Sequence, residues 1–133
     1  MIVIDTSVAV GFLRGDPRSV SRLESEQKLT DFFGISAVSL FELLSPVYHR
    51  KLESQENAVK SFARQMKVLP LDAEAAEESA KIMGVLLRMG QSVNALDVLI
   101  AGSAVSNGAE KLLSRDKDYE KIAKFSDLKL EIV

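Results

Sequence analysis

Short apolar runs alternate with longer segments of helical periodicity along the whole chain. The first run, residues 1–4, is β-branched and stops at Asp5, and apolar residues then recur at helical spacing over residues 8–13. Further short apolar runs lie at 32–36, 67–71, 111–114 and 128–133. Strands that alternate with helices in this way predict an α/β fold with a parallel sheet, helices on both faces and right-handed crossovers.

The helical segments carry recognisable start signals. Asp16 stands at an N-cap position and Pro17 at the first helical position of a polar helix. Pro46 lies inside the helical segment 36–52, where its ring removes a backbone hydrogen bond and predicts a bend. Asp72 is expected to cap another helix. Further helices are expected at 55–66, 95–107 and 118–125.

Apolar spacing within the helices predicts which side chains face the core. In the helix after Asp72 the expected stripe consists of Ala76, Ala80, Met83 and Leu87. In segment 55–66 it consists of Ala58, Phe62 and either Gln65 or Met66. Segment 95–107 is apolar nearly all round, which predicts a buried helix.

Composition is that of a globular protein and excludes several kinds of chemistry. The 133 residues are the size of one domain, so a single domain over 1–133 is expected, and 47% hydrophobic residues exclude a disordered composition. Cysteine is absent, which excludes disulfides, thiolate metal sites and cysteine nucleophiles, and His49 is the only histidine. Any catalytic chemistry is therefore expected to belong to carboxylates.

Hydropathy and net charge bear on where the protein is located and on how it could bind nucleic acid. No apolar stretch approaches the roughly 20 residues that cross a bilayer, and the N-terminus lacks a signal-peptide layout, so we expect a cytoplasmic protein without membrane contact. The net charge of −2 argues against binding nucleic acid mainly by bulk electrostatics. It leaves room for an enzyme whose bound cations supply the positive charge.

Four acidic residues stand where a carboxylate needs an explanation. Asp5 and Asp116 follow predicted strands, although Asp is also a common turn and N-cap residue. Glu42 has apolar neighbours, and with Ser39 it also fits a capping box. Asp97 lies in the first turn of the buried helix, where the helix dipole contributes up to about 1 kcal/mol. Burying a lone carboxylate costs several kcal/mol, so a cation or a hydrogen-bond network is required.

These four positions share one edge of the predicted sheet. Strand-to-helix junctions and first helical turns of a parallel sheet face the edge at which such folds bind ligands. Clustered carboxylates repel one another unless divalent cations lie among them, and oxygen ligands without Cys or His select Mg²⁺ or Mn²⁺. Such a site suits phosphodiester hydrolysis by a metal-activated water.

Four segments carry a family resemblance. They are VIDTSV at 3–8, SLFELL at 39–44, ALDVLIAGSAVSNG at 95–108 and LLSRDKDYEKI at 112–122. In this order and at these separations they resemble the motifs of PIN-domain ribonucleases, most closely the VapC-type toxins of toxin–antitoxin systems. The resemblance spans essentially the whole chain. Each motif alone is common, but four in order within one domain-sized chain are specific.

The resemblance implies a fold, an activity and partners. The expected fold is a PIN-like three-layer arrangement with a central parallel sheet of about five strands. The expected activity is that of an endoribonuclease that depends on Mg²⁺ or Mn²⁺ and cleaves RNA phosphodiester bonds. The expected partners are the RNA substrate, a second copy of the chain in a homodimer, and a small antitoxin protein whose tail occupies the active site.

Residues are carried over from the family position by position. Asp5, Glu42, Asp97 and Asp116 match the acidic quartet, as catalytic residues and metal ligands. Ser7 and Ser114 match the hydroxyl positions that orient the carboxylates or a metal-bound water, and Ser114 stands where Thr is commoner. Asp118 is either an extra ligand or a polar turn residue.

Basic residues near the acids are candidates for substrate binding. Arg14, Arg115 and Lys117 could contact RNA phosphates, or be solvated or paired surface charges. His49 has no partner motif and is expected at the surface or in helix packing. With no Trp and 6% aromatic residues, a platform for stacking bases is not expected.

Two other functions remain open from the sequence. The first is a PIN nuclease of RNA maturation or turnover without an antitoxin. The second is a Mg²⁺-binding phosphoacceptor domain of the signalling type, which needs a lysine after a late strand. Lys111 precedes that strand, and the expected pair of adjacent acids is missing after the first one.

Overall fold

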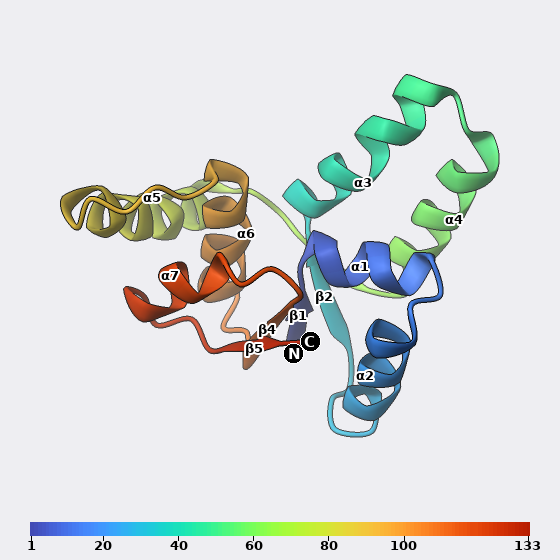
Figure 1. Cartoon of the computed structure of the whole chain (residues 1–133), viewed down its shortest axis with the longest axis horizontal. Coiled ribbons are helices and arrows are strands. Elements are labelled where there is room, and N and C mark those ends of the chain that lie inside the picture. The colour runs from blue at the N-terminus through green and yellow to red at the C-terminus, as the bar shows by residue number, and fades with distance from the viewer.

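Five short parallel strands form one central sheet in the computed structural model, which describes residues 1–133 (Figure 1). The strands are β1 (Ile2–Ile4), β2 (Phe33–Ser36), β3 (Lys67–Leu69), β4 (Lys111–Ser114) and β5 (Leu130–Ile132). Their order in the sheet is β3-β2-β1-β4-β5. The predicted α/β fold with a parallel five-stranded sheet is confirmed, and the strand order reverses between β1 and β4.

Helices cover both faces of the sheet. They are α1 (Thr6–Leu13), α2 (Pro17–Gln27), α3 (Ala37–Arg50), α4 (Glu53–Arg64), α5 (Ala73–Arg88), α6 (Ala95–Ser106) and α7 (Tyr119–Lys124). Figure 1 shows α1–α4 on one side of the sheet and α5–α7 on the other. None of the helices is both long and apolar enough to cross a membrane.

β1 divides the core into two clusters. Ile2 and Ile4 pack with residues of α1, α2, α3 and α4, whereas Val3 packs with residues of α5, α6 and α7. This division follows from the pleat, since successive side chains of a strand point to opposite faces. All three are buried, and full burial of each such side chain contributes about 1.5–3 kcal/mol. The central strand is therefore fixed from both sides, and so is the residue that follows it.

Most of the predicted helix starts are confirmed. Asp16 accepts a hydrogen bond from Ser19 N at 3.0 Å, and Pro17 is the first residue of α2. Asp72 caps α5 through Ala75 N at 2.9 Å. Helix α3 contains Pro46 and continues past it to Arg50.

The predicted stripe of α5 is wrong by one residue. The buried positions are Ala75, Ser79, Ile82 and Leu86, whereas Ala76, Ala80 and Leu87 are exposed and Met83 is half-buried. The cause is a close approach to α6: a Cβ atom on Gly102 would overlap Ser79. Ser79 can be buried there because its hydroxyl donates to Ala75 O at 2.7 Å. Helix α5 is therefore rotated, relative to the prediction, so that the polar residue Ser79 faces the core.

The predicted stripe of α4 is partly wrong for the same kind of reason. Phe62 is buried and Met66 is half-buried as expected, but Ala58 is exposed. The buried neighbours of Phe62 are Val59 and Ala63. Phe62 stacks on Phe12 of α1 with ring centroids 5.2 Å apart, which turns this face toward α1.

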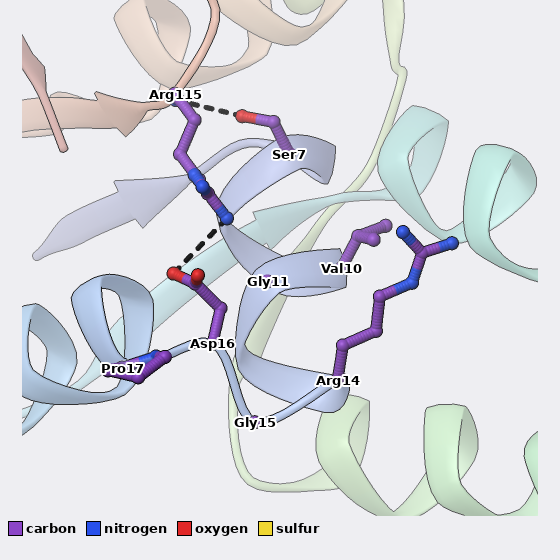
Figure 2. Close-up of a pocket in the computed structure, with 8 residues that line it drawn as sticks. All are labelled: Ser7, Val10, Gly11, Arg14, Gly15, Asp16, Pro17 and Arg115. Carbon is purple, nitrogen blue, oxygen red and sulfur yellow. Dashed lines mark hydrogen bonds and ion pairs between the residues drawn. The ribbon is translucent and has the colours of Figure 1, made fainter.

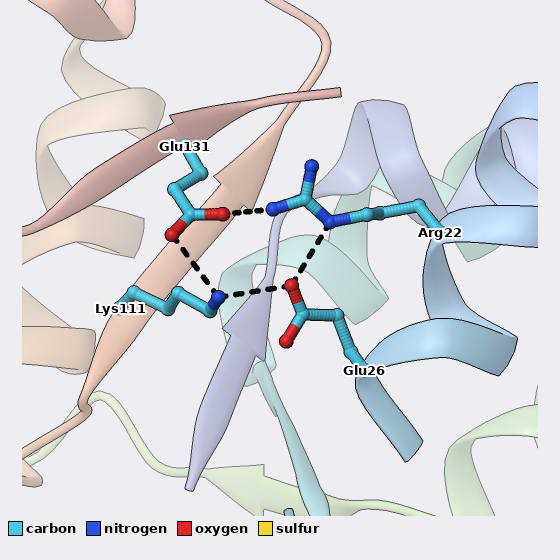
Figure 3. A network of polar contacts seen from close by, with 4 residues as sticks. All are labelled: Arg22, Glu26, Lys111 and Glu131. Carbon is cyan, nitrogen blue, oxygen red and sulfur yellow. Dashed lines mark hydrogen bonds and ion pairs between the residues drawn. The ribbon is translucent and has the colours of Figure 1, made fainter. Parts of the chain in front are cut away.

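Four charged side chains join α2 to the last two strands (Figure 3). Glu26 accepts from Arg22 Nε and from Lys111 Nζ, each at 2.9 Å. Glu131 of β5 accepts from Lys111 Nζ at 3.1 Å and also pairs with Arg22. The side chain of Glu26 is only 4% exposed, so the two cations compensate a buried charge. This ionic network fixes α2 against β4 and β5.

Candidate active site

Asp5 is held rigidly at the end of the central strand. Its backbone N–H still belongs to the sheet and donates to Leu113 O at 3.0 Å. Its side chain caps α1: Oδ1 accepts from Val8 N at 3.0 Å and from Ser7 Oγ at 2.7 Å. Oδ2 accepts from Ser114 Oγ at 2.6 Å. With three donors on a buried carboxylate, the orientation of Asp5 is fixed before any ligand binds.

The two serines connect Asp5 to the loop after β4. Ser7 Oγ accepts from the backbone N–H of Arg115 at 2.8 Å. Ser114 Oγ accepts from the backbone N–H of Asp116 at 2.9 Å. Each hydroxyl therefore accepts from this loop while it donates to Asp5. The loop that carries Asp116 is thereby held beside β1, at the point where the strand order reverses.

Glu42 accepts a hydrogen bond from Thr6, so the alternative explanation of Glu42, a capping box with Ser39, does not hold. The N-cap of α3 is Ser36, whose hydroxyl accepts from Val38 N at 3.1 Å, so Ser39 lies inside the helix. Ser39 Oγ is buried without a hydrogen-bond partner. Glu42 Oε1 instead accepts from Thr6 Oγ1 at 2.7 Å. The acid of α3 is thus fastened to the first turn of α1, next to Asp5.

Asp97 lies in the first turn of α6, as predicted. Asn94 caps this helix by accepting from Leu96 N at 2.8 Å. Burial raises the pKa of Asp97 to about 6, and repulsion from Asp116 and Glu42 adds to the increase. The carboxylate of Asp97 therefore interacts electrostatically with acids from the loop after β4 and from α3.

Asp5 takes part in the same coupling. Burial raises its pKa, the hydrogen bonds from Ser114, Ser7 and Val8 lower it, and repulsion from Asp116 raises it again. Asp5 also contributes to the raised pKa of Asp97. The four predicted acids therefore form one electrostatic cluster, defined by Asp5, Glu42, Asp97 and Asp116, which we call the acidic cluster.

Comparison with known proteins identifies the family. A family profile described as "PIN domain" matches residues 2–125. The chain belongs to the PIN domain family.

Individual relatives of this PIN domain are nucleases in name. The tRNA(fMet)-specific endonuclease VapC of Shigella flexneri is 29% identical over 123 residues, which cover 90% of each chain. The endonuclease of the same name from Salmonella typhimurium is 27% identical over 122 residues. VapBC2 from Rickettsia felis, crystallised with a DNA fragment from their promoter, superimposes with a TM-score of 0.86 at 21% identity, covering 100% of this chain and 99% of that one. The resemblance to VapC-type PIN domains is confirmed.

The acidic cluster of this PIN domain has the donors that a hard cation prefers. Carboxylate and hydroxyl oxygens suit Mg²⁺ and Mn²⁺. No three acidic or histidine side chains are grouped closely enough to enclose an ion. Mg²⁺ does not require such a cage, because it usually keeps several waters and binds through one or two carboxylates. The donor set therefore fits a partly hydrated divalent cation.

An open pocket of about 460 Å³ adjoins the acidic cluster (Figure 2). Arg14, Arg115 and Ser7 are among the residues that line the pocket. Because the Ser7 hydroxyl also donates to Asp5, the pocket lies next to the acidic cluster. Arg115 Nη1 lies 3.2 Å from Asp16 Oδ2, at the N-terminus of α2. Of the predicted basic residues, Arg14 is therefore exposed and Arg115 is paired across the pocket. Lys117 is exposed outside it.

Two further predicted residues take peripheral positions. The side chain of Asp118 is exposed, and its backbone N–H donates to Asp116 Oδ1 at 2.9 Å, which orients that acid. His49 is exposed in the last turn of α3, in agreement with the expected surface position.

Sequence analysis missed two residues of the site. Thr6 was overlooked because its partner, Glu42, lies 36 positions away and has an alternative explanation nearby. Tyr119 opens α7, and its hydroxyl is buried without a hydrogen-bond partner near the acidic cluster. A helical turn that begins three residues after Asp116 was the available signal for Tyr119.

Proposed function

We propose that this PIN domain is the endoribonuclease toxin of a type II toxin–antitoxin pair and cleaves RNA phosphodiester bonds with the help of Mg²⁺ or Mn²⁺. The observation that carries the proposal is the electrostatic coupling of four carboxylates around a buried, fully oriented Asp5. Repulsion that raises the pKa of a carboxyl group costs stability near neutral pH. A cation bound among the carboxylates would offset this cost, which is why the repulsion indicates a binding site.

Within this proposal the acidic cluster divides the work. Asp5, Asp97 and Asp116 would hold the cation, with Glu42 as a direct ligand or through a water. A cation held there would supply water activation and stabilisation of the negative charge that develops on the phosphate. Ser7 and Ser114 keep the Asp5 carboxylate in one orientation, and Thr6 does the same for Glu42.

The pocket beside the acidic cluster is the proposed RNA site. Arg14 and Arg115 are positioned to contact backbone phosphates, with Lys117 as an outer contact. Phosphate contacts of this kind set the register of an RNA on the protein without reading its sequence. Because the VapC relatives carry tRNA(fMet)-specific endonuclease in their names, initiator tRNA is the first substrate to test.

An antitoxin is the proposed protein partner. Solved structures of similar fold include a toxin–antitoxin complex from Klebsiella pneumoniae. Apolar side chains are available for a partner on α3, where Phe41 is 62% exposed and Tyr48 is 53% exposed. Leu87 and Met89, at the end of α5, are 68% and 54% exposed. We propose that these surfaces bury their apolar area in a homodimer and in the antitoxin complex.

Cleavage of defined RNAs tests the proposed function. Purified protein is incubated with initiator tRNA, elongator tRNAs and structured ribosomal RNA fragments, with Mg²⁺, with Mn²⁺ or with a chelator. We expect cation-dependent cleavage that is lost in Asp5→Asn and Asp97→Asn. Cleavage that survives both substitutions would contradict the assigned site, and cleavage that survives the chelator would contradict the cation.

A maintenance nuclease without an antitoxin is the alternative. A short neighbouring reading frame for a DNA-binding protein, and growth arrest on expression of the wild type but not of Asp97→Asn, favour the toxin. The phosphoacceptor alternative has no further support, because receiver domains use the strand order 2-1-3-4-5 and this sheet has the order β3-β2-β1-β4-β5.

A further inference from the structure

The acidic cluster contains one carboxylate without a donor. Asp5 accepts three hydrogen bonds, Glu42 accepts one from Thr6, and Asp116 accepts one from the backbone of Asp118. Asp97 accepts none of the hydrogen bonds formed in the site. Asp97 is half-buried in the first turn of α6, directly before Val98, which packs in the same core cluster as Tyr119.

A donor without an acceptor lies beside it. Tyr119 is 1% exposed, and its hydroxyl has no hydrogen-bond partner. Its surroundings are acidic: burial raises the pKa of Tyr119, and the charges of Asp5, Asp97 and Glu42 raise it further. Burial and the acidic neighbours of Asp97 raise its pKa, whereas the neutral Tyr119 hydroxyl lowers it.

The ring of Tyr119 is fixed by the core, so the hydroxyl is aimed and not merely nearby. The ring packs in the cluster that contains Val3, Leu112 and Ile122. The backbone N–H of Tyr119 donates to Asp116 O at 3.2 Å, which sets the start of α7 against the acidic loop. Phenylalanine would fill the same space without burying an unpaired polar group, so packing alone does not explain a tyrosine here.

We propose that Tyr119 is a positioning residue, whose buried hydroxyl donates to the Asp97 carboxylate and holds it in the orientation in which it binds a cation. This inference rests on the proposed metal-dependent function. The phenol remains protonated throughout and takes no part in bond making or breaking. It acts on Asp97 as the serines act on Asp5 and as Thr6 acts on Glu42.

The test separates cation binding from stability. Mn²⁺ affinity is measured by calorimetric titration, and thermal unfolding is measured without metal, for the wild type, Tyr119→Phe and the matched control Tyr48→Phe. Tyr48 is 53% exposed and its hydroxyl donates to Glu56, far along the chain from the acidic cluster. We expect Tyr119→Phe to weaken Mn²⁺ binding about tenfold, as loss of a group that orients a metal ligand does.

Metal-free stability gives the second readout. Since the hydroxyl makes no hydrogen bond in the structure, Tyr119→Phe is expected to leave the unfolding temperature of the metal-free protein unchanged or to raise it. Unchanged Mn²⁺ affinity, or a fall in metal-free stability without a fall in affinity, would overturn the role of Tyr119. If the wild type itself neither binds Mn²⁺ nor cleaves RNA, the proposed function fails as well, and this outcome is distinct from a failure of Tyr119 alone.

Discussion

Thr6 Oγ1 donates to Glu42 Oε1 at 2.7 Å and ties the acid of α3 to the residue that follows Asp5. This hydrogen bond joins two elements of the chain that meet only in the folded sheet. It orients one carboxylate of the acidic cluster from the helix that another carboxylate caps. The geometry of the acidic cluster therefore depends on α1 at two successive residues.

Loss of this hydrogen bond is expected to reduce cleavage without unfolding the protein. In Thr6→Val the shape is kept but Glu42 loses its donor, and we expect a roughly tenfold fall in the rate of RNA cleavage. Ser39→Ala is the matched control, because Ser39 Oγ is buried without a partner and its loss should be neutral or stabilising. Single-turnover cleavage rates of Thr6→Val and Ser39→Ala test which residue orients Glu42. A larger loss of cleavage rate in Ser39→Ala would favour the capping box of Ser39 and Glu42.

Asp5→Asn is expected to abolish cleavage while the fold remains. Asparagine keeps one acceptor oxygen for the cap of α1 but removes the charge that a cation needs, so we expect a loss on the order of 10³-fold. Asp72→Asn makes the same change at the N-cap of α5, outside the acidic cluster, and should retain full activity. Cleavage assays together with circular dichroism of both variants test this. Equal activity in Asp5→Asn and Asp72→Asn would contradict the role of Asp5.

The raised pKa of Asp97 predicts how stability changes with pH. Its pKa in the folded protein is about 6, above the ordinary value of 3.8, so the folded state binds a proton more tightly than the unfolded state. The stability of the metal-free protein should therefore fall as the pH rises from about 4 to about 6. At pH 7 we expect Asp97→Asn to raise the free energy of unfolding by about 1 kcal/mol, after allowance for its partial exposure. Urea unfolding at pH 4 and at pH 7 measures it, and a destabilised Asp97→Asn would contradict the coupling.

The ionic network predicts a stability effect far from catalysis. In Lys111→Met, Glu26 loses one of its two cations in a buried position, so we expect a loss of about 2 kcal/mol in the free energy of unfolding. Lys81→Met is the control, because Lys81 is exposed and its pair with Glu78 is worth little. Cleavage per folded molecule should be unchanged in both. Equal stability of the two variants would contradict this account of the network.

Contacts between residues close together in the chain were easier to predict from the sequence than contacts between residues far apart in it. Asp5 and Asp116 were expected at one edge because the carboxyl ends of parallel strands share an edge, whereas Glu42 and Asp97 lie inside helices α3 and α6. Ser7 and Ser114, which donate to Asp5, were expected from the family resemblance. Thr6, which donates to Glu42, was not expected, because it lies 36 positions from its acid in the chain. The sequence also allowed a local partner for Glu42, the capping box with Ser39. In the structure Glu42 instead accepts a hydrogen bond from Thr6, a contact that cannot be inferred from the sequence.

The rotation of α5 shows a second limit. Its amphipathic pattern allowed two adjacent stripes, and the one with more apolar side chains was not the buried one. Ser79 was buried because its hydroxyl is satisfied within its own helix and because Gly102 leaves room for it. The apolar pattern of a helix describes only the side chains of that helix. It does not show the space that a glycine leaves on a neighbouring helix.

The contact between Ser79 and Gly102 also has a consequence for the chemistry. Gly102 lies five residues after Asp97 on the same helix, so its close approach to Ser79 fixes where the helix that carries Asp97 lies beside α5. A methyl group at position 102 would overlap the backbone of Ser79, so Gly102→Ala would displace α6 from α5 and move Asp97 with it. The absence of a side chain at Gly102 therefore helps to set the position of an acid that we propose as a metal ligand.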